Sequence, residues 1–306
     1  MPANKPKVSV IIPAYNCETV IGRAISSVLK QNEVELEIII IDDGSTDNTR
    51  YEVTCFENRV RYFFQSNSGP AAARNRGLAE SRGEFIAFLD ADDEWLPEYL
   101  EKTIPLLVRD NKVGLVYSWA IKRNKTGHDK IRNLQSPSRN SWHTLLWPDP
   151  LQCTPATICR RTVLEKVGDF DTSLKTREDL DLWIRIGEIA GVAVIPEPLV
   201  VVHHSGNSYS SSHDIEQMKT DYFRIITKAL ERSPELYTKK QRIIMAEAFR
   251  YWGQHELYFG YSREARKDLL SSLCVLPSMS ALLSLSACLL PSGVLKTLRN
   301  FYSRRL

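Results

Sequence analysis

The sequence predicts a doubly wound α/β domain followed by a helical extension. Continuous apolar runs rich in β-branched residues are typical of strands that a parallel sheet buries on both faces, and they occur at 8–13, 37–43, 59–64 and 84–90. Helical patterns separate them, at about 19–30, 46–56 and 70–81. This alternation favours a parallel sheet with helices on both faces, whereas the chain beyond about residue 213 shows helix signals alone.

Composition and charge narrow the class of protein. With 306 residues, of which 43% are hydrophobic and 25% charged, the chain has ordinary globular composition and can bury a full core. The formal net charge of +3 is too small to indicate a nucleic-acid partner. Six cysteines without a CxxC pair argue against a disulfide framework or a zinc site and fit a reducing compartment. The first apolar run is too short for a signal peptide, so we expect a cytoplasmic protein.

Polar segments follow three of the predicted strands, at 13–16, 42–45 and 90–93. In doubly wound domains, ligands bind outside the carboxyl ends of the strands. We therefore expect these segments to meet at one edge of the sheet and to form a site there.

The segment DDGSTDNT, 42–49, allows two interpretations. Asp-Gly-Ser is turn chemistry, and Ser45, Thr46 or Asp47 would then cap the helix that follows. Alternatively, Asp43 accepts hydrogen bonds from a nucleobase, and Tyr15 on the neighbouring strand end stacks on that base or flanks it.

The segment FLDADDEW, 88–95, places four acids directly behind a buried strand. Carboxylates this close raise one another's pKa unless a cation shares them. Asp93 suits the cap of a helix, because Pro97 fits a first helical turn. Asp90 and Asp92 lie two residues apart and project to the same side of an extended segment, so they predict a site for Mn²⁺ or Mg²⁺ beside substrate phosphates.

The segment 65–81 begins as a loop, 67–70, and continues as a helix whose small residues permit close packing. Arg74 and Arg76 are solvated charges on this helix in one interpretation. In the other, Arg74 points toward a nucleotide diphosphate or toward the acids that follow the next strand.

Five segments carry a resemblance to a known family. In order, they are VSVIIPAYN, IIIIDDGSTDNT, NSGPAAARNRGL, GEFIAFLDADDEW and REDLDLWIRI. Over roughly residues 6–210 the chain resembles a family 2 glycosyltransferase of the GT-A fold, of the bacterial cell-surface glycan type. The resemblance implies a mixed, Rossmann-like doubly wound sheet. It also implies that a sugar passes, with inversion, from a nucleotide-diphosphate donor (UDP-sugar favoured) to a hydroxyl of a glycan or lipid-linked acceptor.

The resemblance also assigns roles to individual residues. Asp179 would be the general base, and Asp90 and Asp92 would be the DxD pair that serves the ribose and a Mn²⁺ or Mg²⁺ cofactor. The residues expected at the nucleotide sugar are Pro13, Tyr15, Asn16, Asp43, Asn67, Gly69, Arg74, Asp90, Ala91, Asp92 and Glu178. His204 lies in a His-x-Gly-x-Ser-like element and matches a further metal ligand better than His203 does. In the alternative interpretation, these histidines are structural residues that form hydrogen bonds after a strand and do not bind metal.

The segment 176–191 is predicted to be a helix. One face of this helix would pack on the core through Leu180, Trp183, Ile184 and Gly187. Glu178 and Asp179 would then lie at the mouth of the site. Acids also favour helix amino termini without any catalytic role, because of the helix dipole.

We expect a glycosyltransferase domain at 1–212, divided into a nucleotide-sugar half at about 1–112 and an acceptor half at about 113–212, and a helical region at 213–306. Segment 151–171 resembles the acceptor side. The polar loop 122–150 carries aromatic residues, and variable loops on a rigid scaffold are where an acceptor is chosen.

The end of the chain combines apolar and basic residues. The run 269–290 is apolar but contains Pro277 and six serines, which makes it a poor candidate for a membrane-spanning helix. No acid follows Asp268, and the cations are Lys296, Arg299, Arg304 and Arg305. We expect 269–306 to contact the anionic inner face of the cell membrane. Alternatively, these helices pack on the catalytic domain and the basic end is solvated.

Other functional classes fit less well. A sugar nucleotidylyltransferase would need a Gly-rich phosphate loop after its first strand, where this chain has PAYNCETVIG. A catalytically inactive relative that binds nucleotide sugar at a membrane is the non-enzymatic alternative. The presence of Asp43, Asp90, Asp92 and Asp179 argues against it.

Overall fold

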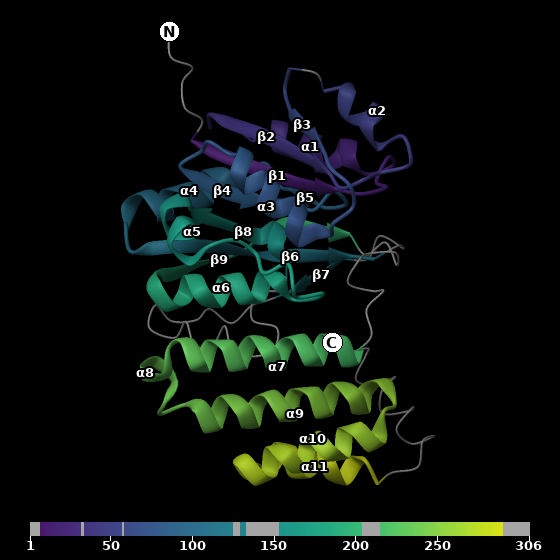
Figure 1. Ribbon diagram of the computed structural model, residues 1–306, viewed down its shortest axis with the longest axis vertical. Coiled ribbons are helices and arrows are strands. Elements are labelled where there is room, and N and C mark those ends of the chain that lie inside the picture. Colours follow the sequence, from purple (N-terminus) through teal and green to yellow (C-terminus); the bar gives the residue numbers. More distant parts are fainter. Residues whose placement is uncertain are drawn as a thin grey trace. The chain divides into compact units, whose positions relative to one another are not determined.

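The structure is a computed structural model, and it describes residues 7–31, 34–56, 58–124, 129–132, 153–203 and 215–289 (Figure 1). These residues fall into two compact units, one that ends at residue 203 and one that begins at residue 215. The first unit is mixed α/β, and the second consists of helices.

A sheet of nine strands, counted over the described residues, forms the first unit. The strands are β1 (Val8–Ala14), β2 (Leu36–Asp42), β3 (Arg61–Phe64), β4 (Phe85–Phe88), β5 (Glu94–Trp95), β6 (Val113–Arg123), β7 (Asp129–Arg132), β8 (Thr157–Arg160) and β9 (Gly191–His203). Their order is β3-β2-β1-β4-β8-β6-β9-β5, and β7 pairs with β6. Strands β3, β2, β1 and β4 are parallel, whereas β8 runs antiparallel to both β4 and β6. The sheet is therefore mixed, as predicted.

Helices cover both faces of this sheet. They are α1 (Ile21–Leu29), α2 (Thr49–Thr54), α3 (Pro70–Glu80), α4 (Tyr99–Arg109), the 3-10 helix η2 (Thr154–Ala156), α5 (Arg161–Val167) and α6 (Glu178–Ile189). Successive residues of a strand point to opposite faces. Val10 and Ile12 of β1 accordingly pack with residues of α1 and α4, whereas Ile11 faces α3.

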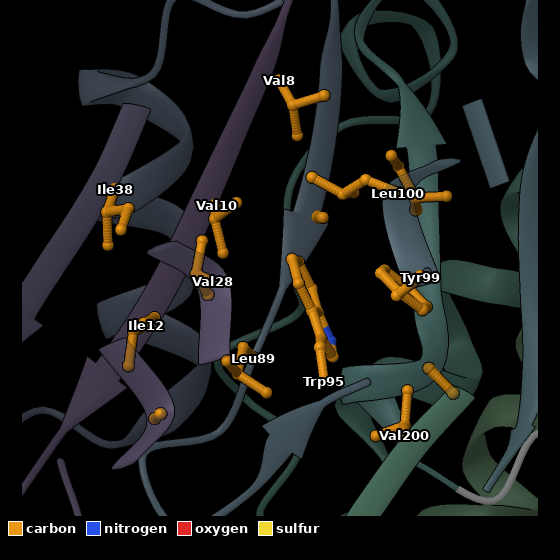
Figure 2. Close-up of a cluster of buried hydrophobic side chains, with 14 of the residues drawn as sticks. Val8, Val10, Ile12, Val28, Ile38, Leu89, Trp95, Tyr99, Leu100 and Val200 are labelled. Atoms are coloured by element: carbon orange, nitrogen blue, oxygen red, sulfur yellow. The ribbon is translucent and has the colours of Figure 1, made fainter. Parts of the chain in front are cut away.

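The core on the α1 and α4 side fixes the segment that follows β4. Figure 2 shows Trp95 with Leu89, Tyr99 and Leu100 in this cluster. The rings of Trp95 and Tyr99 stack with their centroids 4.3 Å apart. Trp95 Nε1 also donates a hydrogen bond to the Pro155 carbonyl at 2.8 Å. The end of the acid-rich segment is thus anchored in the core.

Helix α3 lies unusually close to β1. An ideal Cβ built on Gly77 would lie 2.3 Å from Cγ2 of Ile11, which is closer than real Cβ contacts. The small residues that the sequence shows in this helix therefore bring its backbone onto the sheet.

Part of the predicted polar loop 122–150 is strand. Lys122 and Arg123 end β6, and they pair with Lys130 and Asp129 of β7. The predicted helix at 46–56 is shorter than expected, since α2 spans Thr49–Thr54.

The second unit contains α7 (Ile215–Arg232), α8 (Pro234–Tyr237), α9 (Gln241–Phe259), α10 (Ser262–Val275) and α11 (Met279–Ala287). Lys219 of α7 lies between two buried acids. Its Nζ is 2.8 Å from Glu256 Oε1 and 2.5 Å from Asp268 Oδ2. Burial raises the pKa of both carboxyl groups, and Lys219 offsets part of that rise. Within the described ranges, no helix has the length and apolar character needed to cross a membrane.

Candidate active site

The polar segments after β1, β2 and β4 meet at one edge of the sheet. Ala14 pairs in register with Asp42, and Ile11 pairs with Phe88 at the end of β4. Because β8 runs antiparallel to β4, its first residue, Thr157, and the preceding η2 lie at the same edge. The convergence predicted from the sequence is confirmed.

Asn16 joins the loops after β1 and β2. Its backbone N–H donates to Ser45 Oγ at 3.0 Å, and its Oδ1 accepts from the Thr46 N–H at 2.8 Å. Ser45 and Thr46 therefore do not cap α2. Asn48, at the cap position, makes no side-chain cap hydrogen bond, and Asp47 accepts from the N–H of Thr49, the first residue of the helix. Tyr15 beside Asn16 is 53% exposed, so its ring is accessible to a ligand.

Asp43 holds the loop that precedes α3. Its Oδ1 accepts from Gln65 Nε2 at 2.7 Å and from the Ser68 N–H at 2.9 Å, and its Oδ2 accepts from the Gly69 N–H at 2.8 Å. The residue is only 4% exposed. A carboxylate has about four lone-pair sites, so one acceptor position remains for a nucleobase. Contact with a base stays a prediction.

Arg74 is a buried cation between two acids. Its Nη2 is 2.8 Å from Asp90 Oδ1, and its Nη1 is 2.6 Å from Glu178 Oε1. Its guanidinium carbon lies 5.6 Å from the centre of the Phe170 ring. Burial lowers the pKa of Arg74, but the charges of Asp90 and Glu178 raise it more. Of the interpretations left open by the sequence, the structure selects the acids after the next strand, and a solvated Arg74 is wrong.

The four acids at 90–94 divide among several partners. Asp90 pairs with Arg74. Asp93 Oδ1 accepts from the His203 N–H at 2.9 Å, and Glu94 Oε1 lies 2.8 Å from His203 Nε2. Two of the acids therefore hold the end of β9. The prediction that Asp93 caps a helix is wrong, because its carboxylate binds β9 and α4 begins without a side-chain cap.

Asp92 occupies the centre of this acidic turn, and its carbonyl accepts a hydrogen bond from Arg23 Nη2. Burial, and next the charge of Asp90, raise the pKa of Asp92 to about 6. Burial and the charges of Asp90 and Asp92 raise the pKa of Asp93 well above its ordinary value. Carboxylates that repel one another in this way are stabilised by a cation.

The donor set fits a divalent cation that arrives with a substrate. Over the part of the chain that is described, no three His, Cys, Asp or Glu side chains converge on a metal position. Mg²⁺, however, is commonly bound by one or two carboxylates together with substrate phosphates and water. Asp90 and Asp92 would supply these carboxylates. His204, the third predicted ligand, lies outside the described residues.

Glu178 and Asp179 open helix α6 and have different partners. Arg177, directly before them, has a left-handed φ of 60°. Burial raises the pKa of Glu178, which Arg74 partly offsets. Asp179 Oδ2 accepts from Thr154 Oγ1 at 2.9 Å, and its Oδ1 accepts from the Leu180 N–H at 2.7 Å.

The predicted apolar face of α6 is buried, as its Leu180, Trp183, Ile184 and Gly187 show. The Trp183 ring lies 6.2 Å from the Phe88 ring of β4, centroid to centroid. This packing brings the start of α6 to the edge of the sheet where Asp90 lies.

The remaining predicted residues occupy the same edge. Pro13 is half-buried near the end of β1, Ala91 is 8% exposed within the acidic turn, and Asn67 is exposed in the loop that Asp43 holds. Sequence reasoning missed the contacts of Arg23 and Thr154, because a single arginine or threonine in a helix or turn carries no distinguishing pattern.

The acidic turn at 90–94 and the two acids that open α6 lie at one edge of a mixed α/β sheet, an arrangement that fits the class of glycosyltransferases. Glycosyl transferase family 2 matches residues 9–168, more than half of the chain. The chain therefore belongs to glycosyl transferase family 2.

Curated relatives agree with this family. An uncharacterized glycosyltransferase of Nostoc sp. is 38% identical over 177 residues, 54% of each chain. The Escherichia coli UDP-Glc:alpha-D-GlcNAc-diphosphoundecaprenol beta-1,3-glucosyltransferase WfgD is 34% identical, over 58% of this chain and 69% of that protein. TuaG of Bacillus subtilis, assigned to teichuronic acid biosynthesis, is 29% identical over 74% of this chain and 90% of its own. The match spans about half of the Nostoc relative and 34% of a Rickettsia conorii one.

Solved structures show the GT-A fold. TarS of Staphylococcus aureus has a TM-score of 0.63 at 20% identity, over 90% of this chain and 50% of that one. The mannosyltransferase PcManGT of Pyrobaculum calidifontis, in complex with GDP-Man and Mn²⁺, has a TM-score of 0.61 at 22% identity, over 98% and 84%. The predicted fold, including a helical carboxyl-terminal part, is confirmed.

Proposed function

We propose that this protein transfers a sugar, with inversion, from a nucleotide-diphosphate sugar to a hydroxyl of a glycan or lipid-linked saccharide during cell-surface polysaccharide synthesis. The observation that best supports this proposal is a buried cluster in which Arg74 pairs with Asp90 of the acidic turn and with Glu178 at the start of α6. UDP-sugar is the favoured donor. WfgD, whose name gives UDP-Glc and a diphosphoundecaprenol-linked acceptor, and the complex of TarS with UDP-GlcNAc support this choice.

In this proposal Asp179 is the general base. A carboxylate oxygen of Asp179 takes the proton of the acceptor hydroxyl. The hydroxyl oxygen bonds to the anomeric carbon while the bond between that carbon and the diphosphate breaks on the opposite face. Thr154 holds Asp179 Oδ2 and so orients the carboxylate. Asp90 and Asp92 would hold Mn²⁺ or Mg²⁺, which when bound neutralises the charge of the leaving diphosphate. Tyr15 and Asp43 would contact the base.

The test is calorimetric titration with UDP, GDP, dTDP and CDP, with and without Mn²⁺. We expect one nucleotide to bind wild-type protein in a metal-dependent way, and Asp92→Asn to lose that dependence. Asp169→Asn is the matched control, because it makes the same change at an exposed residue outside the acidic turn. Binding that ignores the metal in the wild type would contradict the cation site.

Turnover separates the enzyme from an inactive binding module. Asp179→Asn keeps nucleotide binding and lowers the rate of nucleotide release from the donor by about 10²–10⁴, the usual contribution of a general base. If wild-type protein binds the nucleotide but releases none from any sugar donor, the binding-module alternative replaces the proposal.

We also propose a cytoplasmic location at the inner face of the cell membrane.

A further inference from the structure

Helix α11 and the turn after it present apolar side chains to the outside. Met279, Leu282, Leu283 and Leu289, the outer stripe, are 70%, 48%, 65% and 75% exposed. Met279, Leu282 and Leu283 lie three and four residues apart, which places them on one side of the helix, and Leu289 lies in the turn that follows it.

The inner side of α11 is only partly apolar: Leu285 packs against Ala265 and Leu269, and small or polar residues lie beside it. Gln254 Nε2 of α9 donates to Ser284 Oγ at 2.7 Å and to Ser280 Oγ at 3.4 Å. Ala281 is fully buried. A helix that packs on a globular core normally turns its leucines inward and its serines outward. Leu285 follows this rule, whereas Met279, Leu282 and Leu283 face outward, which indicates that the outer stripe has an apolar partner.

Cations flank the outer stripe at both ends. Arg242 Nη2 donates to the Val275 carbonyl just before α11, at 2.8 Å, and Arg266 Nη2 donates to the Cys288 carbonyl just after it, at 3.3 Å. Both arginines are exposed.

Acids are scarce in the same region. In the hairpin 262–289 they are Glu264 and Asp268, and Asp268 is buried against Lys219. The sequence beyond, 290–306, has no acid and contains Lys296, Arg299, Arg304 and Arg305. The partner is therefore apolar at its centre and negatively charged at its borders.

We infer that the outer stripe inserts into the interface of an anionic lipid bilayer, with Arg242 and Arg266 at the headgroup phosphates. Apolar side chains at the acyl boundary and arginines at headgroup level are the arrangement that interfacial helices use. A second copy is a poorer occupant, because a symmetric dimer brings the same patch of each subunit together and would oppose like charges. The inference rests on the proposed function only for its purpose, which is to bring the site to a lipid-linked acceptor.

Sedimentation of the full chain with vesicles tests this inference. We expect binding to vesicles of phosphatidylglycerol and phosphatidylcholine and little binding to phosphatidylcholine alone. The double substitution Leu282→Ser and Leu283→Ser lowers the partition coefficient at least about tenfold, because two buried apolar side chains are lost. Val108→Ser with Ile189→Ser is the matched control, since these side chains are 51% and 54% exposed elsewhere. Arg242→Gln with Arg266→Gln weakens binding and its dependence on salt.

Three results would overturn the inference. They are equal vesicle binding by wild type and the double leucine variant, self-association without lipid that this variant abolishes, and a lower unfolding temperature of the variant, which would place the stripe inside the protein. Nucleotide titration of the same samples keeps the two proposals separate. Failed vesicle binding with intact metal-dependent nucleotide binding removes only the membrane contact.

Discussion

Replacing Arg74 with methionine removes the cation of a buried cluster while keeping most of the side-chain volume. Arg74 is 5% exposed, and its partner Glu178 is 8% exposed. Loss of one partner of a buried ion pair costs about 3–5 kcal/mol, because the other charge stays buried without compensation. The side chain of Asp90 is 33% exposed, so water takes over part of its pairing and it contributes less. We therefore expect the free energy of unfolding to fall by about 3–5 kcal/mol, mostly through Glu178.

Urea denaturation of wild type, Arg74→Met, Glu178→Gln and the double variant measures this coupling. The double variant is expected to lose less than the sum of the single losses, because each change removes the same interaction. Arg76→Met is the control: this arginine donates to the Phe64 carbonyl at the surface, and we expect a loss of under about 1 kcal/mol. A loss of under about 1 kcal/mol for Arg74→Met, or additive losses in the cycle, would refute the reasoning.

Three further predictions concern other parts of the chain. Thr154→Val lowers kcat roughly tenfold or more, because it removes a hydrogen bond to the candidate base Asp179. Thr154→Ser keeps the hydroxyl group and is expected to retain the wild-type kcat. Equal kcat values for wild type and both variants would contradict this role. Lys219→Met leaves the buried carboxyl groups of Glu256 and Asp268 without their cation, so their pKa rises further. Because a carboxyl group whose pKa is raised by folding makes the protein less stable as pH rises, urea denaturation is expected to show a larger loss of unfolding free energy at pH 8 than at about pH 5. Equal losses at the two pH values would contradict this prediction. Gly77→Ala lowers the free energy of unfolding by about 1–3 kcal/mol, because the added methyl group overpacks Ile11. Gly22→Ala stabilises α1 slightly, because its added methyl group would lie 3.9 Å from the nearest neighbouring atom. Denaturation midpoints that shift in the same direction for both variants would refute this account.

The parallel strands and the acids at their ends were predictable because both leave local patterns. Buried parallel strands such as β2 and β4 require continuous apolar runs, and the acids of the candidate site follow directly behind them. Strand β6 carries an apolar run as well, but a run of that kind fits a buried strand or a buried helix equally. Its antiparallel neighbour β8 is too short to show a period.

Apart from the pairing of Arg74 with Asp90, which the sequence offered as one interpretation, the partners of the site residues were not predictable, because they depend on the tertiary fold. Asp43 carries the turn chemistry that the sequence shows, yet its carboxylate binds a loop 22 to 26 residues away. Asp93 looks like a helix cap locally, but it binds the backbone of His203. A carboxylate takes whichever donors the fold brings to it, and the donors at β9 are invisible in the segment around residue 93.

The long sequence separation of these contacts has a consequence for folding. Arg74 and Glu178 are 104 residues apart, and Asp93 and His203 are 110 apart. Such contacts form late, because closing the intervening chain costs conformational entropy before the contact is made. A nascent chain that has reached residue 168, where the family match ends, carries the acidic turn but lacks both Glu178 and His203. Arg74 and Asp90 are only 16 residues apart and can pair early, whereas Asp93 gains its hydrogen bond from His203 only after synthesis has reached the end of β9.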